Sequence, residues 1–156
     1  MPVGHLELLK ILTAHRVPVV VIGGHAVTFH GHIRETEDLD VIWLRSPDAE
    51  RSLLSALTVV NAKWISNAVD PATGLEKLVP VSLPYIQAHH LMMLVTDLGL
   101  LDLFDYVPGV PDANVQSVFD QSIPSGDARF VSLDWLRRMK SATDRSKDAE
   151  DLRQLE

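Results

Sequence analysis

Residues 20–43 read VVIGGHAVTFHGHIRETEDLDVIW, and this stretch predicts both the fold class and the position of a site. An apolar, β-branched run ends at Gly23-Gly24, a pair that permits a sharp turn and lets a phosphate group approach the backbone amides. Residues 25–32 are compatible with a short helix, whose N-terminus would favour an anion. Because a glycine pair is also typical of an ordinary strand-to-helix turn, the residues that follow it decide the interpretation.

Two aspartates stand at the start of the next predicted strand, residues 39–44. Side chains alternate along a strand, so Asp38 and Asp40 point to one face and Leu39 to the other. Two carboxylates on one face repel each other, and a bound cation relieves that repulsion. A solvated acidic loop is the alternative. A glycine turn and a carboxylate pair separated by one short helix together favour a site for a metal and a phosphorylated ligand.

The remainder of the chain predicts an α+β (α/β) fold, with a mixed sheet flanked by helices and with C-terminal helices. We expect a single domain over residues 1–156, with a catalytic core at about 17–110 and C-terminal helices at about 131–156. The expected elements are a helix at 5–16, strands at 17–22 and 39–44, a helix at 47–60, a β-rich stretch at 61–110, and helices from 131 onward with Ser132 and Ser146 as caps.

The composition restricts the classes of function. The chain has no cysteine, so disulfides and thiolate chemistry are excluded, and its net charge of -7 argues weakly against extensive nucleic-acid binding. Its apolar runs are too short to span a bilayer, and its N-terminus does not resemble a signal peptide. We therefore expect a cytoplasmic protein without membrane contact.

The order Gly-Gly, helix, Asp-x-Asp resembles the nucleotidyltransferase superfamily related to DNA polymerase beta. The stretch IGGHAVTFHGHIRETEDLDV and the C-terminal LDWLRRMKSATDRSKDAEDLRQLE are more closely similar to the toxin component of type IV toxin–antitoxin systems, the AbiE kind, and its small stand-alone relatives. The corresponding positions are Gly23, Gly24, Ala26, His30, Gly31, Arg34, Thr36, Asp38 and Asp40, and then Lys140, Arg145, Lys147, Asp148 and Asp151.

This resemblance implies an enzyme that uses Mg²⁺ (or Mn²⁺) to move a nucleoside monophosphate from a nucleoside triphosphate (NTP), such as ATP, to a hydroxyl group. It implies that Asp38 and Asp40 are metal ligands and that Gly23-Gly24 forms the phosphate turn. The family places a third carboxylate on a later, adjacent strand. Residues 98–109, LGLLDLFDYVPG, offer Asp102 as first choice and Asp105 as second, unless both are strand-end residues that face water.

Three further residues are candidates for nucleotide or phosphate binding. Arg34 either contacts phosphate or pairs with a neighbouring glutamate, Glu35 or Glu37, at the surface. Thr36 is expected to orient the loop before the Asp-x-Asp strand. Lys140 resembles a family lysine that points toward the nucleotide, and a solvated helix lysine is the alternative.

The acceptor stays open between RNA (the tRNA 3′ end), a protein and a small molecule. A toxin–antitoxin component is favoured by the resemblance, with a cognate antitoxin or a homodimer as the expected partner. The alternatives are an antibiotic adenylyltransferase of the aminoglycoside or lincosamide type, and a non-catalytic nucleotide-binding partner module. Because the glycine pair and both aspartates are intact, catalysis is preferred to the non-catalytic alternative.

Overall fold

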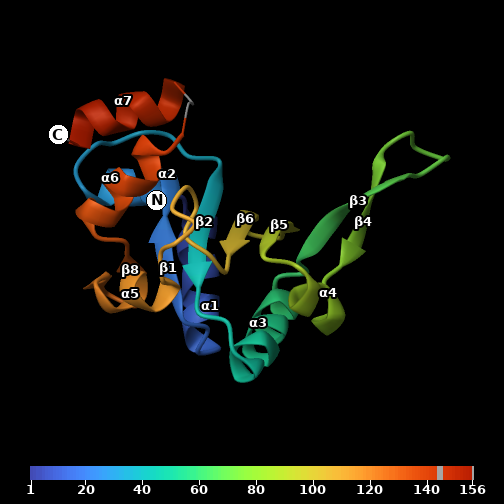
Figure 1. Cartoon of the computed structure of the whole chain (residues 1–156). Coiled ribbons are helices and arrows are strands. Elements are labelled where there is room, and N and C mark those ends of the chain that lie inside the picture. The colour runs from blue at the N-terminus through green and yellow to red at the C-terminus, as the bar shows by residue number, and fades with distance from the viewer. Residues whose placement is uncertain (144–145, 156) are drawn as a thin grey trace.

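The computed structural model describes residues 1–143 and 146–155, and shows the α+β architecture with a mixed sheet that the sequence predicts (Figure 1). The strands run in the spatial order β4-β3-β5-β6-β2-β1-β8-β7. Their bounds are β1 Val19–Ile22, β2 Asp38–Trp43, β3 Lys63–Val69, β4 Glu76–Pro80, β5 Leu91–Thr96, β6 Gly99–Phe104, β7 Ile123–Ser125 and β8 Ala128–Phe130. The helices are α1 Val3–Ala14, α2 Gly23–Phe29, α3 Pro47–Val59, α4 Leu83–Ala88, α5 Val115–Asp120, α6 Leu133–Ser141 and α7 Ser146–Leu155.

Strand β2 lies at the centre of the sheet and sets the register of the site. It pairs antiparallel with β1 and parallel with β6, and Asp40 is the partner of Asp102 in the β2–β6 ladder. Partners in a ladder point to the same face of the sheet. Asp38, Asp40 and Asp102 therefore share one face, which we call the site face.

The alternation along β2 divides the core between the two faces. On the face opposite the site, Leu39 and Val41 are fully buried in a cluster with Leu8 of α1 and Leu53 of α3. On the site face, Ile42 packs into a second cluster that includes residues of β1, α2 and α6. The helices thus cover both faces around β1 and β2.

The β3–β4 hairpin leaves this two-sided arrangement and projects from the main body (Figure 1). Most of its side chains are exposed, in contrast to those of β1 and β2. None of the helices in the described ranges has both the length and the apolar character needed to cross a bilayer.

Several sequence predictions need correction in detail. Helix α2 begins at Gly23 and ends at Phe29, whereas the sequence suggested 25–32. Residues 83–88 form helix α4 inside the stretch predicted to be β-rich, because Ser82 accepts a hydrogen bond from the backbone N–H of Tyr85 and so caps a helical turn. Helix α5 and the β7–β8 hairpin occupy a segment for which the sequence predicted no element. Ser132 caps α6 as predicted, whereas the side chain of Ser146, the predicted cap of the last helix, lies outside what the structure describes.

Candidate functional site

Three carboxylates meet on the site face of the sheet. Asp38 and Asp40 come from β2 and Asp102 from β6, and one carboxylate oxygen of each lies within 4.8 Å of the others. We call these residues the acidic triad. All three side chains are half-buried. The structure thus brings together the three residues predicted to be metal ligands, and their predicted role is considered below.

The acidic triad is electrostatically unfavourable when no cation compensates it. Burial, followed by the neighbouring carboxylates of Asp102 and Asp38, raises the pKa of Asp40 to about 7. Burial, followed by the charge of Asp38, raises the pKa of Asp102 as well. Such shifts arise when like charges crowd together in a partly desolvated place. Oxygen ligands with this charge suit a hard divalent cation, so the residues present fit Mg²⁺ or Mn²⁺.

The glycine pair lies against the residues predicted to share its site. Gly23 has a φ of +67°, and a Cβ atom at this position would overlap the carboxylate of Asp40. A Cβ atom at Gly24 would overlap the hydroxyl group of Thr36 and crowd the guanidinium group of Arg34. Both positions therefore require glycine for space, and Gly23 also requires it for backbone conformation.

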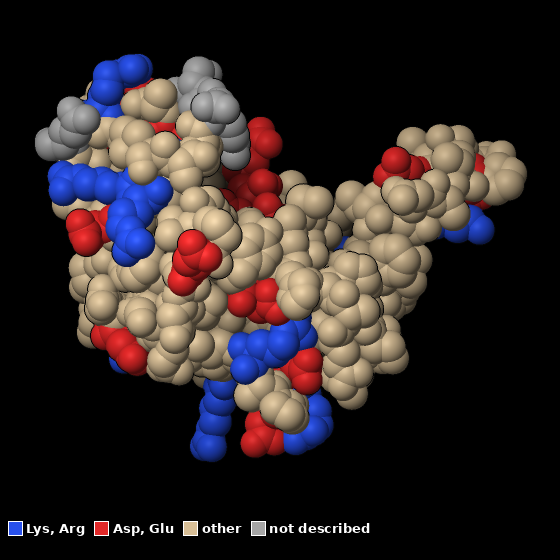
Figure 2. All heavy atoms as spheres, in the orientation of Figure 1, with Lys and Arg blue, Asp and Glu red and all other residues tan. Residues whose placement is uncertain are grey.

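A pocket of about 320 Å³ opens over the acidic triad. The hollow between the main body and the β3–β4 hairpin has acidic side chains gathered on its body side (Figure 2). Of the residues predicted for the site, only Gly24 does not line the pocket, and it lies against Thr36. The predicted residues that line the pocket are Gly23, Arg34, Thr36, Asp38, Asp40, Asp102 and Lys140.

Two cationic side chains of the pocket are held by carboxylates of the last helix. Lys140 Nζ lies 2.6 Å from Asp148 Oδ1 and 3.2 Å from Asp151 Oδ2. Arg34 Nη1 lies 3.4 Å from the same Asp151 oxygen. Lys140 is 8% exposed, so the interpretation of a solvated helix lysine is wrong. Arg34 pairs with Asp151 rather than with a neighbouring glutamate.

Buried polar atoms at this pocket remain without a hydrogen-bond partner. Within the described residues they include Arg34 Nε and Thr36 Oγ1. An unpaired buried donor costs about 1–3 kcal/mol. Both atoms lie beneath the wall of the pocket, on the side that faces Gly24.

Asp105, the second choice for the third carboxylate, lies in a different environment. Its Oδ2 atom lies 2.8 Å from Arg45 Nε and 2.8 Å from His90 Nδ1, and its side chain is 7% exposed. Arg45 also pairs with Glu50 at 2.7 Å. Asp105 therefore belongs to an ion-pair cluster at the end of β6, and it is Asp102 that joins the acidic triad.

Three pocket residues were not predicted to line the site. Glu37 and Phe104 flank the acidic triad in sequence, and Phe104 shares a face with Asp102 by simple strand alternation, so this pattern could have identified it. Asp148 lines the pocket as the partner of Lys140. Arg145 and the side chain of Lys147, which contribute to the C-terminal resemblance, lie outside the residues that the structure describes.

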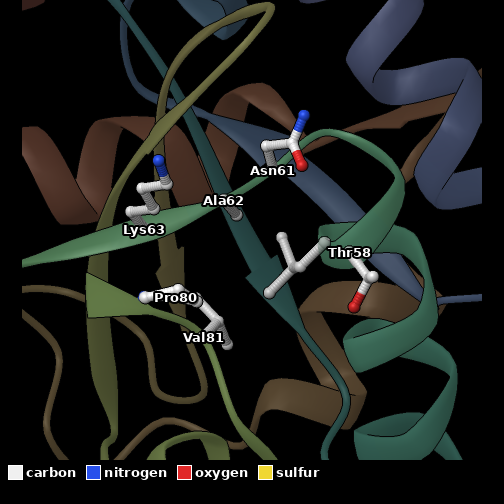
Figure 3. A pocket seen from close by; sticks show the side chains of 7 residues that line it. Thr58, Asn61, Ala62, Lys63, Pro80 and Val81 are labelled. Carbon is white, nitrogen blue, oxygen red and sulfur yellow. The ribbon is translucent and has the colours of Figure 1, made fainter. Parts of the chain in front are cut away.

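A second pocket lies where the end of α3 meets the base of the β3–β4 hairpin (Figure 3). It measures about 170 Å³, and its lining includes Thr58, Asn61, Lys63 and Pro80. Its lining contains no carboxylate, and it shares no residue with the pocket over the acidic triad. It therefore lacks the acidic ligands that the triad offers to a divalent metal.

Comparison with known proteins supports the fold. No protein-family model and no curated sequence matches the chain. The solution structure of the antibiotic-resistance factor ANT(2'')-Ia is similar with a TM-score of 0.58 at 12% identity, over 96% of this chain and 79% of that one. JHP933 from Helicobacter pylori is similar with a TM-score of 0.45 at 16% identity, over 97% of this chain but only 64% of JHP933. The closer resemblance to the AbiE kind stays a prediction, and the likeness to ANT(2'')-Ia shows that this chain has the nucleotidyltransferase fold.

Proposed function

We propose that this protein is a nucleotidyltransferase that moves a nucleoside monophosphate from an NTP to a hydroxyl group. The observation that carries the proposal is the acidic triad, in which carboxylates from two paired strands meet beside Gly23 in a pocket. Without a bound cation, the mutual repulsion of these three carboxylates would destabilise the folded protein. The fold shared with ANT(2'')-Ia is consistent with this chemistry.

Asp38, Asp40 and Asp102 would hold Mg²⁺ or Mn²⁺. When bound, the metal supplies charge neutralisation for the triphosphate and for the charge that develops during transfer. The raised pKa of Asp40 supports this assignment, because a cation would allow all three carboxylates to be ionised together.

The protein's own groups would position the triphosphate. Gly23 lacks a side chain where the backbone borders Asp40, which lets the Asp40 carboxylate lie against the turn at the edge of the pocket. Arg34, Thr36 and Lys140 line the pocket, and the carboxylates of α7 fix the guanidinium of Arg34 and the ammonium group of Lys140 in place. Fixed donors of this kind stabilise a transferring phosphoryl group without reorganisation.

The transfer exchanges one bond at the α-phosphorus of the NTP for another. The acceptor oxygen forms a bond to the α-phosphorus of the NTP, and the bond from that phosphorus to the oxygen bridging to the β-phosphate breaks. Pyrophosphate leaves with the bonding electrons. The hydroxyl proton passes to a carboxylate, for which we assign Asp102, since it is the triad member that comes from β6 and lines the pocket.

The test is transfer of label from the four α-labelled NTPs, with and without MgCl₂, to total RNA, a protein mixture and an aminoglycoside. We expect Mg²⁺-dependent transfer that Asp40→Asn reduces by at least 100-fold. Asp112→Asn, which changes an exposed aspartate away from the pocket, is the matched control and should retain full activity. Transfer that persists in Asp40→Asn would refute the site.

The non-catalytic alternative makes a different prediction in the same experiment. A nucleotide sensor or partner module would bind NTP with Mg²⁺ and transfer no label. A role in a toxin–antitoxin pair, with a cognate antitoxin as partner, stays a proposal that depends on finding transfer first. Modification of a cationic antibiotic is the second enzymatic candidate, because the acidic wall of the hollow would attract such a molecule (Figure 2).

A further inference from the structure

The row of residues that contains Asp40 and Asp102 continues across the sheet beyond the acidic triad. Asp102 is the ladder partner of Met93 in β5. The β3–β5 ladder pairs Trp64 with Leu94, so Ile65 and Met93 are the residues that come next along the two strands, and Ile65 is in turn the partner of Leu78 in β4. The site face therefore continues from the triad across β5 to the base of the projecting hairpin.

This continuation is apolar and uncovered. Met93 is 61% exposed, Ile65 49%, Leu78 47%, and Leu100, in the adjoining row, 40%. We call these four residues the apolar strip. On the opposite face, Leu94 of β5 and Leu101 of β6 are buried under helices. Exposed apolar side chains that adjoin one another mark interaction surfaces more often than isolated ones do.

We propose that the apolar strip docks a protein acceptor, and that the hydroxyl group that receives the nucleotide belongs to a Ser, Thr or Tyr side chain of that protein. This inference rests on the nucleotidyltransferase function proposed above. Its geometric basis is continuity, since an acceptor that lies along the strip ends at the acidic triad. The new bond would join the acceptor side-chain oxygen to the α-phosphorus, with pyrophosphate as the leaving group.

The shape of the surface favours a polypeptide over a small molecule. The pocket over the acidic triad is lined by none of the four strip residues, so the strip lies on open sheet outside it. Small ligands are usually enclosed in concave sites, whereas flat apolar surfaces are typical of protein interfaces.

The charge of the surface argues against RNA. Within the two rows that carry the triad and the strip, the ladders place a single cationic residue, Lys63, which is the partner of Val95 and Pro80. The adjoining wall is acidic, and the chain carries a net charge of -7 (Figure 2). RNA binding needs basic side chains to neutralise phosphates. An acceptor segment with apolar and basic residues would match both the strip and the acidic wall.

The strand spacing sets the expected sequence preference. Neighbouring strands lie about 4.8 Å apart, so the strip extends roughly 5 to 15 Å from Asp102. An extended peptide covers this span in about four residues. The apolar residues that bind the strip should therefore lie within about four positions of the modified hydroxyl.

The experiment compares three acceptor pools with α-labelled NTP and MgCl₂. They are a positional peptide library with a central Ser, Thr or Tyr, total tRNA, and an aminoglycoside together with a lincosamide. The variants are Met93→Glu and Ile65→Glu, with Val59→Glu as control, because Val59 on α3 is an equally exposed apolar residue away from the strip. Thermal unfolding and Mg²⁺-dependent NTP binding are measured for each variant, and the conservative Met93→Leu should retain transfer.

We expect transfer to peptides with nearby apolar residues, reduced at least tenfold by Met93→Glu and by Ile65→Glu, with NTP affinity unchanged within twofold. The docking inference is overturned if the label appears in tRNA or in a drug, or if the strip variants transfer label to peptides as well as the parent protein does. Either result leaves the proposed function standing. No transfer to any of the three pools with NTP binding intact overturns both the docking inference and the proposed transferase function, because that is the result expected of a nucleotide sensor. If the parent protein does not bind NTP in the presence of Mg²⁺, the proposed function itself is wrong.

Discussion

The carboxylate of Asp40 occupies the space into which a side chain at Gly23 would project. The two residues belong to consecutive elements, and the β1–β2 ladder places Ile22 directly opposite Asp40. Asp40, a predicted metal ligand, can therefore hold its observed position only because residue 23 has no Cβ atom.

Gly23→Ala should consequently impair the site more than it impairs folding. The new methyl group would displace the Asp40 carboxylate, and the φ of +67° adds a strain of about 1–2 kcal/mol. We expect metal-dependent NTP binding to weaken at least tenfold, measured by titration calorimetry. Gly126→Ala is the matched control, because Gly126 has a φ of +60° and no atom within 4 Å of its added Cβ. If both variants bind NTP equally well, the close contact between residue 23 and Asp40 does not affect nucleotide binding.

Asp102 and Asp105 should respond in opposite ways to replacement by asparagine. Asp102→Asn removes one member of the acidic triad, so Mn²⁺ binding should fall at least tenfold while the melting temperature holds or rises. Asp105→Asn removes the negative charge that lies 2.8 Å from Arg45 Nε, and should cost about 1–3 kcal/mol of stability with metal binding retained. Electron paramagnetic resonance of bound Mn²⁺ and thermal unfolding separate the two effects. The reverse pattern would identify Asp105 as the third ligand.

The stability of the metal-free protein should fall as pH rises toward neutrality on account of Asp40. The pKa of this carboxyl group is raised from 3.8 to about 7 by burial and by its carboxylate neighbours. Between these values the folded state holds a proton that the unfolded state has released, so rising pH favours unfolding. Asp40→Asn should remove this dependence and stabilise the metal-free protein at pH 7.5 by about 1–3 kcal/mol. Urea unfolding at several pH values measures this change, and Asp112→Asn should leave the slope as it is in the parent protein.

The local part of the site could be predicted from sequence because short-range rules set it. Strand alternation places Asp38 and Asp40 on one face, and a glycine pair at a strand end indicates a close backbone approach. Asp102 required the family resemblance, since Asp105 stands three residues further along the same apolar run. Its membership of the triad follows from the parallel register of β2 and β6, which no local pattern specifies.

The surroundings of the site could not be predicted, because they depend on contacts between distant segments. Burial of Lys140 results from the packing of α7, which carries Asp148 and Asp151. Arg34 pairs with that same helix rather than with the glutamates next to it in sequence. Helix α4 has a different cause, since the valines before it are typical of a strand and the helix begins only because Ser82 caps it.

A buried histidine pair should produce a pH dependence of the opposite sign to that of Asp40. His5 Nδ1 lies 2.7 Å from His25 Nε2, a contact that requires one ring nitrogen to donate and the other to accept. Burial, followed by the charge of His5, lowers the pKa of His25 from 6.5 to about 4. The unfolded chain therefore binds more protons below pH 6.5, and stability should fall by about 3 kcal/mol as pH decreases from 6.5 to 4.

Because the effects of Asp40 and His25 oppose each other over the same pH range, this prediction is best tested in an Asp40→Asn background. There we expect urea unfolding to show a loss of stability between pH 6.5 and pH 4 that His25→Gln reduces to less than half. Gln keeps an acceptor oxygen for a donating His5 ring while carrying no titratable proton. His32→Gln is the control, since His32 is outside the pair, and it should leave the pH dependence intact. An unchanged slope in His25→Gln would show that the acid sensitivity comes from groups other than the buried pair.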